Sequence, residues 1–170
     1  DKNMNKQTVT ETNIAGVDCG KLFDQSINPV SFCEDPRKII PNYGSIVYTI
    51  WNRSGEWIYV GIGGLGQSPA TPLKKRNPVS RILQHQSGRR SGDQFCIYVH
   101  DYYIVPRIEP ETYQFIRGDL DRMTKDFIRN ELCYRFIVLQ TEDSIEKARK
   151  IESKLKSGYL SYGKPLLNGV

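Results

Sequence analysis

The alternation of hydrophobic and polar positions predicts a β-hairpin in the first half of the chain. Residues 45–62 are rich in Val, Ile, Tyr and Trp, and the polar run Asn52-Arg53-Ser54-Gly55 interrupts them, which is typical of two strands joined by a tight turn. If the last two residues of that run form a two-residue turn, Tyr48 faces Gly61, and Tyr48 and Tyr59 share one face of the hairpin. A three-residue loop would place the two tyrosines on opposite faces.

A helix of about ten residues is predicted after the hairpin. Asn77 followed by Pro78 is typical of a helix N-terminus, and Gly88 is typical of a helix end. With a helical period, the apolar side of this segment consists of Val79, Ile82, Leu83 and the stem of Gln86. A second stripe carries Arg81, His85 and, one turn beyond the helix, Arg89.

The remaining segments predict a mixed fold. Residues 120–132 have the period of a helix, residues 133–139 are an apolar run typical of a buried central strand, and residues 93–108 fit either a strand or a helix. These elements predict an α/β domain of the α+β type over residues 44–170, with a small, mainly antiparallel three-stranded sheet flanked by helices. Residues 1–43 are expected to form an N-terminal extension, with a polar arm followed by an irregular segment packed on the core.

The last predicted helix places an acidic residue among apolar ones. It begins near Asp143 in a sequence similar to a capping box. Its apolar residues occupy an arc of about 120° at the spacing of a helix, and they are Ile145, Ala148, Ile151 and Leu155. Glu152 falls inside the same arc. A carboxylate on the packed side of a helix needs a cation, a metal or hydrogen-bond donors, so Glu152 is expected in an internal salt bridge or as a metal ligand.

Length and composition narrow the class of protein. The chain has 170 residues, of which 38% are hydrophobic and 25% charged, as expected for one globular domain with an extension. No apolar run approaches the roughly 18 residues of a membrane span, and the start of the sequence lacks the apolar centre of a signal peptide. A cytoplasmic (intracellular) protein without membrane association is therefore expected. The four cysteines are widely spaced, which predicts reduced, buried thiols rather than a zinc site.

The glycines of residues 58–72 fit the pattern G-x-G-x-x-G at Gly61, Gly63 and Gly66. A dinucleotide site needs a helix directly after such glycines and an acidic residue roughly 20 positions later. Here prolines and small polar residues follow, as in a loop, and the first acidic residue is Asp93. No nucleotide cofactor is therefore expected.

Positive charge is concentrated in one window of the sequence. The net charge is +5, and residues 74–90 hold six Lys or Arg and no acid, which leaves about −1 on the remainder of the chain. Such a run is either a solvated face or a strip that contacts phosphates.

The order of these features resembles the GIY-YIG nuclease family. In the first predicted strand Tyr48 follows Ile46 and Val47, and Tyr59-Val60-Gly61 begins eleven residues later in the second. The family has an Arg on the next helix, often with a His one turn later, then a Glu on a late helix and an Asn near the end of the domain. The matching positions here are Arg81, His85, Glu152 and Asn168.

The resemblance covers about Gly44 to Asn168 and includes departures. Ile46, Val47 and Val60 differ from the residues of the family signature, and these differences concern packing more than chemistry. The loop before Arg81 is long, so Arg76, or with less support Lys74 or Lys75, is an alternative to Arg81.

The resemblance implies a metal-dependent endodeoxyribonuclease that hydrolyses phosphodiester bonds. In this interpretation Glu152 binds one divalent cation, Mg²⁺ or another such as Mn²⁺, Arg81 holds the scissile phosphate, and Tyr48 is the general base. Tyr59 positions water or phosphate, and His85 assists proton transfer or contacts phosphate. Asn168 is expected to be a structural amide that orients the site.

Double-stranded DNA is the implied substrate. The residues expected to contact it outside the reacting centre are Lys74, Lys75, Arg76, Arg89, Arg90 and Gln94. A sequence-specific restriction endonuclease is the expected role, cutting both strands as a homodimer or by sequential nicking. The alternatives are a repair, phage or mobile-element nuclease, and a non-catalytic nucleic-acid-binding module on the same fold.

Overall fold

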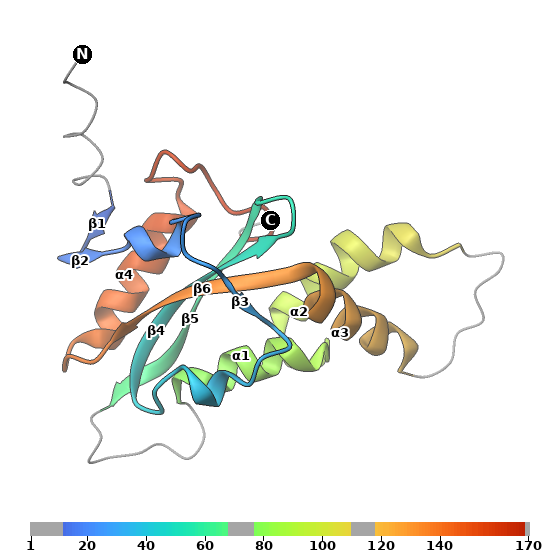
Figure 1. Cartoon of the computed structure of the whole chain (residues 1–170), viewed down its shortest axis with the longest axis horizontal. Coiled ribbons are helices and arrows are strands. Elements are labelled where there is room, and N and C mark those ends of the chain that lie inside the picture. Colours follow the sequence, from blue (N-terminus) through green and yellow to red (C-terminus); the bar gives the residue numbers. More distant parts are fainter. Residues whose placement is uncertain (1–11, 68–76, 110–117, 169–170) are drawn as a thin grey trace.

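A computed structural model shows a mixed α+β fold built on an antiparallel sheet of four strands (Figure 1). The structure describes residues 12–67, 77–109 and 118–168. In spatial order the strands are β3 (Val30–Ser31), β6 (Leu132–Leu139), β4 (Gly44–Asn52) and β5 (Trp57–Gln67). A separate two-stranded sheet precedes them, formed by β1 (Asn13–Ile14) and β2 (Val17–Asp18).

The prediction of a three-stranded sheet was wrong by one strand, because the N-terminal extension adds an edge. Val30 of β3 pairs with Tyr134 of β6. The extension also includes two short 3-10 helices, η1 (Gly20–Leu22) and η2 (Pro36–Lys38). Its apolar side chains are buried in two different cores, namely Leu22 and Phe23 in one and Phe32 and Ile40 in the other. Burial of these side chains ties the extension to both faces of the sheet.

The turn between β4 and β5 is longer than the two-residue turn considered from the sequence, because Asn52 and Glu56 pair and enclose the three residues 53–55. The backbone N–H of Asn52 donates to the carbonyl of Glu56 (3.1 Å), and that of Gly55 donates to the carbonyl of Asn52 (3.1 Å). Gly55 has a φ of +80°, a left-handed conformation that is typical of the last residue in such a loop.

A register shift compensates for the longer loop. The shift lies between Ile50 and Trp51, so one extra residue of β5 is accommodated close to the turn. Beyond it Tyr48 pairs with Gly61 and Ile50 pairs with Tyr59. The pairing predicted for the two tyrosines is therefore confirmed, and both lie on one face of the sheet.

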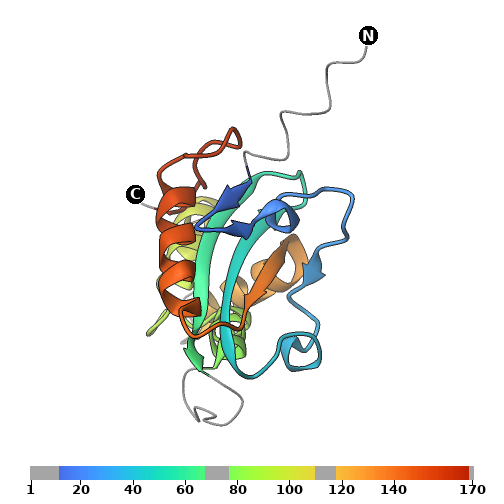
Figure 2. The ribbon, with the colours of Figure 1, turned by 90° about the vertical axis from the view of Figure 1, so that its left-hand side faces the viewer.

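Helices cover both faces of the sheet. One face is covered by α1 (Pro78–Ser87), α2 (Gln94–Val99) and α3 (Asp119–Glu131), and the chain after α2 continues as the π-helix η3 (His100–Ile104) and the 3-10 helix η4 (Val105–Arg107). The other face is covered by α4 (Ser144–Lys156), which lies along β4 and β5 (Figure 2). Successive residues of a strand point to opposite faces, so Tyr48 belongs to the core under α1 and Val47 to the core under α4.

Most of the predicted elements are present. The helix expected after Asn77, the helix over residues 120–132 and the buried central strand over residues 133–139 are confirmed as α1, α3 and β6. Residues 93–108, which fitted a strand or a helix, are helical. In the parts of the chain that the structure describes, no helix is both long and apolar enough to cross a bilayer.

Candidate active site

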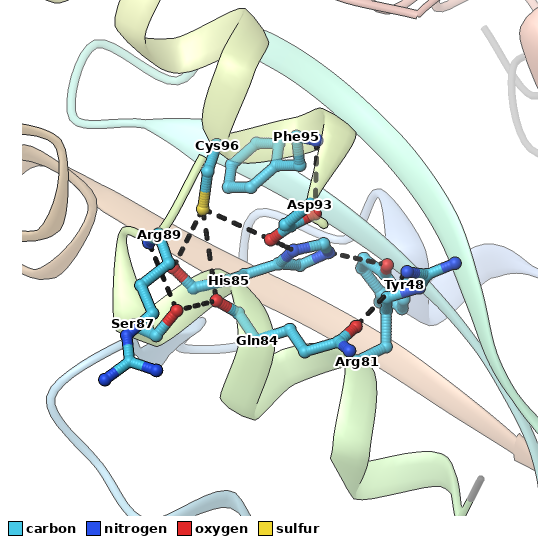
Figure 3. A network of polar contacts seen from close by, with 9 residues as sticks. All are labelled: Tyr48, Arg81, Gln84, His85, Ser87, Arg89, Asp93, Phe95 and Cys96. Carbon is cyan, nitrogen blue, oxygen red and sulfur yellow. Dashed lines mark hydrogen bonds and ion pairs between the residues drawn. The ribbon is translucent and has the colours of Figure 1, made fainter. Parts of the chain in front are cut away.

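Three side chains from separate elements form a buried hydrogen-bonded chain (Figure 3). The hydroxyl of Tyr48 lies 2.8 Å from Nε2 of His85, and Nδ1 of His85 lies 2.7 Å from Oδ2 of Asp93. Tyr48 is on β4, His85 is on α1, and Asp93 is the N-cap of α2. The imidazole therefore connects a phenol at the sheet to a carboxylate at the start of a helix.

A glycine makes room for the phenol end of this chain. Gly61 pairs with Tyr48 across the hairpin, and a Cβ added at Gly61 would overlap the hydroxyl and the ring of Tyr48. Tyr59 flanks the same space, with its ring centroid 6.5 Å from that of Tyr48 and 6.0 Å from that of His85. The glycine of the Tyr59-Val60-Gly61 segment thus has a steric role, because only a residue without a side chain lets the Tyr48 ring lie over β5.

Capping and close packing set the position of His85 on α1. The side chain of Asn77 accepts a hydrogen bond from the backbone N–H of Ser80 (2.9 Å) at the N-terminus, and Gly88 ends the helix with a φ of +66°. A Cβ at Gly88 would overlap the backbone of Lys125 on α3. The end of α1 is therefore fixed against α3, close to His85.

The structure corrects the predicted orientation of α1. The sequence placed Leu83 on the apolar side and His85 on a second stripe beside it, but His85 is 1% exposed and Leu83 is 36% exposed. The buried arc centres on Ile82, which places His85 at one margin and Leu83 outside the other. Burial of the imidazole is tolerated because both ring nitrogens have hydrogen-bond partners.

In the His85–Asp93 pair, burial and the mutual hydrogen bond act in opposite directions on each pKa. Burial lowers the pKa of His85, although the neighbouring Asp93 acts in the opposite direction. Burial would raise the pKa of Asp93, but hydrogen bonds from His85, from the thiol of Cys96 (3.2 Å) and from the backbone N–H of Phe95 (3.2 Å) bring it below its usual value. Which ring nitrogen of His85 donates and which accepts depends on its tautomer, and both nitrogens have a partner within 2.8 Å.

Both tyrosines are neutral phenols in this environment. Burial is the main cause that raises the pKa of Tyr48 and that of Tyr59 above the usual value of a phenol. Glu152 raises both pKa values further, whereas the guanidinium of Arg81 lowers both. The charges of Arg81 on α1 and Glu152 on α4 therefore act in opposite directions on the pKa values of the same two hydroxyls.

Glu152 lies at the margin of the buried side of α4, not within it as the sequence predicted. The buried residues of this helix are Ser144, Ala148, Ile151 and Leu155, whereas Ile145 is only partly buried. The packed arc is thus rotated toward Ser144, which leaves the Glu152 side chain 21% exposed. Its Oε1 lies 3.2 Å from Nζ of Lys156, one turn along the helix.

The environment of Glu152 fits a divalent cation that keeps most of its own water. Mg²⁺ in enzymes is commonly held by one or two carboxylates, with waters and substrate phosphate oxygens completing the shell. Within residues 12–67, 77–109 and 118–168, no group of three His, Cys, Asp or Glu side chains gathers to hold a metal. Any ion held by Glu152 would therefore take most of its other ligands from water or substrate.

Asn168 fastens the C-terminal segment to the edge of the sheet. Its Oδ1 accepts from the backbone N–H of Val60 (2.6 Å), and its Nδ2 donates to the carbonyl of Val60 (2.9 Å). The backbone N–H of Leu167 also donates to the carbonyl of Ile58 (2.8 Å). Asn168 thus provides hydrogen-bond partners for the backbone N–H and carbonyl of Val60 at the free edge of β5, between Tyr59 and Gly61. This contact is consistent with the expected structural role.

The structure separates the predicted DNA contacts into different kinds. Arg81 is exposed and its Nη1 donates to the neutral amide of Gln84 (3.2 Å). Arg90 forms an ion pair with Asp121 (2.8 Å), which occupies its guanidinium. Arg89 and Gln94 are exposed, and Arg89 lines a groove of about 370 Å³ that borders Asp93. Lys74, Lys75 and Arg76 lie outside the described residues.

Asp93 and Cys96 are site residues that the sequence analysis did not identify. Asp93 is eight residues beyond His85, and the turn between them includes Gly88 and Gly92, both with positive φ. The sequence carries one relevant signal, since Asp is a favoured N-cap and Asp93 precedes a helix. Nothing in its spacing indicates that its second carboxylate oxygen faces an imidazole.

Comparison of the chain with models of known protein families, with the sequences of curated proteins and with solved structures finds no match.

Proposed function

We propose that this protein is a metal-dependent DNA endonuclease of the GIY-YIG type. The observation that carries the proposal is the hydrogen bond between Tyr48 and His85, with Arg81 and Glu152 close enough to alter the pKa of the same phenol. These are four of the residues to which the resemblance assigns phosphodiester hydrolysis, and they come from three different elements. Packing alone accounts for any one of them but does not require that a buried phenol bond a histidine and feel the charges of both Arg81 and Glu152.

In the proposed reaction, Tyr48 and His85 together activate the attacking water. A proton passes from the water to the oxygen of Tyr48 while the Tyr48 hydroxyl gives its own proton to Nε2 of His85. The water oxygen bonds to phosphorus as the bond to the 3′ oxygen breaks. The released 3′ oxygen takes a proton from solvent, which leaves a 3′-hydroxyl and a 5′-phosphate. The relay avoids a free phenolate, whose formation at pH 7 costs a free tyrosine about 4 kcal/mol and costs more here because burial raises the pKa of Tyr48.

Arg81 is suited to hold the scissile phosphate. Its guanidinium is exposed on α1, and its hydrogen bond to a side chain is to the neutral amide of Gln84. A guanidinium that is not neutralised by a carboxylate can offer a planar pair of donors to two phosphate oxygens. The same charge stabilises the additional negative charge that develops on those oxygens during attack.

Glu152 is the proposed ligand for the divalent cation. When bound, Mg²⁺ or Mn²⁺ supplies positive charge that offsets the charge on the leaving oxygen. The partial exposure of Glu152 leaves space for the water and phosphate ligands that such an ion requires. Lys156 pairs with the same carboxylate, so loading of the site requires this ammonium group to move aside.

The burial of the site divides it into two layers. Tyr48 and His85 are each 1% exposed, so a DNA backbone does not contact them directly and only a water molecule can connect Tyr48 to the substrate. Tyr59 is partly buried, Arg81 is exposed and Glu152 is partly exposed. We assign contact with the phosphodiester to these outer three and water activation to the inner pair.

The test is metal-dependent cutting by matched variants. Supercoiled and linear DNA are incubated with wild-type protein, Glu152→Ala and Glu146→Ala, in Mg²⁺ and in EDTA. Glu146 is the matched control because it is on the same helix and forms the same type of pair, with Lys150 (2.9 Å). Cutting that requires Mg²⁺, disappears in Glu152→Ala and persists in Glu146→Ala is expected.

The products discriminate among biological roles. Discrete fragments from linear DNA support the predicted restriction endonuclease, and nonspecific nicking supports a repair, phage or mobile-element nuclease instead. Salt-sensitive DNA binding without any cutting contradicts the nuclease proposal and supports a non-catalytic binding module. Sedimentation with and without a cleaved duplex decides whether both strands are cut by a homodimer.

A further inference from the structure

We infer that Asp93 is a positioning residue that holds His85 in the Nδ1-protonated tautomer and so leaves Nε2 free to take the proton of Tyr48. The inference rests on the proposed function for its role in a reaction. The tautomer itself is a property of the free protein and is measured without DNA.

The two carboxylate oxygens of Asp93 have different tasks. Oδ1 accepts from the backbone N–H of Phe95 (3.2 Å) and caps α2, whereas Oδ2 lies 2.7 Å from Nδ1 of His85. Capping alone requires one oxygen and places no demand on the direction of the other. The second oxygen is aimed at the imidazole, and the thiol of Cys96 donates to it as well (3.2 Å).

The donors around Asp93 require that it remain a pure acceptor. Two contacts of its side chain are to donors, the backbone N–H of Phe95 and the thiol of Cys96, and the third is to Nδ1 of His85. An ionised carboxylate satisfies all of them at once. With Nδ1 protonated by this arrangement, the lone pair of Nε2 faces the Tyr48 hydroxyl at 2.8 Å.

Ring packing fixes the orientation of the imidazole plane, in addition to the effect of Asp93 on its tautomer. The ring of Phe95 lies 4.6 Å from that of His85, centroid to centroid, and Tyr59 packs against Phe95 at 4.9 Å. Asp93 is 4% exposed and His85 1%, so bulk water cannot replace the carboxylate as the partner of Nδ1. Orientation of a base by a buried carboxylate at its other nitrogen is the general logic of acid–base dyads and triads.

Asp93→Asn is the informative substitution because it keeps the cap and changes the donor pattern. Asn is as good an N-cap as Asp, and its oxygen can still accept from Phe95 while its NH₂ group then faces His85. An NH₂ group can only donate, so Nδ1 must become the acceptor and Nε2 must carry the proton. Nε2–H then points at Tyr48, and the phenol has no base.

The first measurement is the tautomer of His85 by ¹⁵N NMR of the free protein. The chain has two histidines, so His100→Gln identifies the signals of His85. The expected result is a protonated Nδ1 and an unprotonated Nε2 in the wild type, with the reverse in Asp93→Asn. A wild-type His85 protonated at Nε2, or an unchanged tautomer in Asp93→Asn, overturns the inference.

The second measurement is cutting of the DNA substrate under saturating and limiting conditions. Asp93→Asn is expected to lower kcat by at least about 100-fold while KM changes less than about threefold, as for loss of a group that acts only on the base. Asp35→Asn is the matched control, because Asp35 also caps a short helix by accepting from a backbone N–H, that of Arg37 (3.0 Å). It should leave kcat unchanged.

The two measurements separate failure of the inference from failure of the proposed function. If the wild type cuts no DNA under any condition, the nuclease assignment fails, and the NMR result still decides whether Asp93 sets the state of His85. If the tautomer reverses in Asp93→Asn but kcat is unchanged, the positioning role in the reaction is refuted. An equal loss of kcat in Asp35→Asn would also refute it, because capping would then explain the effect.

Discussion

The hydroxyl of Tyr48 and Nε2 of His85 lie 2.8 Å apart although 37 residues separate them in the chain. One comes from the central hairpin and the other from the helix that covers it. Both are almost completely buried. This bond connects the phenol and the imidazole that the proposed water activation requires. Tyr48 is therefore the first residue to test.

Tyr48→Phe should abolish cutting with a modest loss of stability. The ring remains, but Nε2 of His85 loses its hydrogen-bond donor while buried, which destabilises a protein by about 1–3 kcal/mol. Tyr134→Phe is the control, since within the described chain the Tyr134 hydroxyl is buried without a hydrogen-bond partner. We expect that variant to be neutral or slightly more stable and fully active. Urea unfolding and a plasmid cutting assay measure both effects, and equal behaviour of the two variants would contradict the assigned role of Tyr48.

Acid should destabilise the protein through His85 before it acts through Asp93. The folded state lowers the pKa of His85 below its usual 6.5 by burial, so only the unfolded chain takes up a proton as the pH falls below about 6.5. Stability is therefore at its full value above that pH and declines below it, with a slope of up to about 1.4 kcal/mol per pH unit. Asp93, whose pKa is also lowered in the folded state, adds its own loss only below about its usual 3.8.

The measurement for this prediction is the urea midpoint between pH 5 and pH 8 for the wild type, His85→Gln and His100→Gln. The decline between pH 6.5 and 5 should be smaller in His85→Gln than in the wild type. His100→Gln should retain the wild-type slope in that range. A slope in His85→Gln equal to that of the wild type would show that other groups cause the acid sensitivity.

Gly61→Ala should destabilise the protein by about 1–3 kcal/mol, the range for overpacking a core. The added Cβ overlaps Tyr48, so the ring must move away from His85 and cutting should fall as well. Replacing Tyr48 by a smaller side chain removes the overlap with the Cβ of residue 61. The double variant Gly61→Ala, Tyr48→Leu is accordingly expected to be more stable than the sum of the two single effects predicts, and strict additivity would show that the glycine has no role in placing Tyr48.

Asn168→Ala should lower stability by about 1–3 kcal/mol through loss of both side-chain bonds to Val60. Without them the edge of β5 next to Tyr59 is held less firmly, so cutting should fall in proportion to the folded fraction and recover when the temperature is lowered. Asn130→Ala is an exposed control with no expected effect. A complete loss of cutting in a fully folded Asn168→Ala protein would instead assign Asn168 a direct part in the reaction.

Arg89 and Arg90 should differ in their effect on DNA binding. Arg90 is paired with Asp121, whereas Arg89 is exposed at the groove beside Asp93. We expect Arg89→Ala to weaken binding uniformly across sequences and to reduce the salt dependence of the affinity by about one phosphate contact. Arg90→Ala should mainly affect stability. Fluorescence anisotropy at several salt concentrations checks both, and a larger binding defect in Arg90→Ala would reverse the assignment.

Local chemistry made several features predictable. Asn77, Pro78 and Gly88 set the ends of α1 because caps act through neighbouring backbone groups. The run over residues 133–139, which is apolar except for Arg135, identified the central strand because a strand buried on both faces is mostly apolar. The shared face of Tyr48 and Tyr59 followed from the hairpin pattern, although the loop length behind that reasoning was wrong and a register shift compensated for it.

What the sequence by itself determined is the local part of this protein: the helix ends, the hairpin, the central strand and a set of residues whose order resembles one nuclease family. The tertiary structure alone decided that β3 joins the sheet, that His85 rather than Leu83 is buried, and that Asp93 faces the imidazole. The physical reason is that caps and periodicity depend on residues a few positions apart. Whether a polar side chain can be buried depends instead on hydrogen-bond partners that residues distant in the sequence supply.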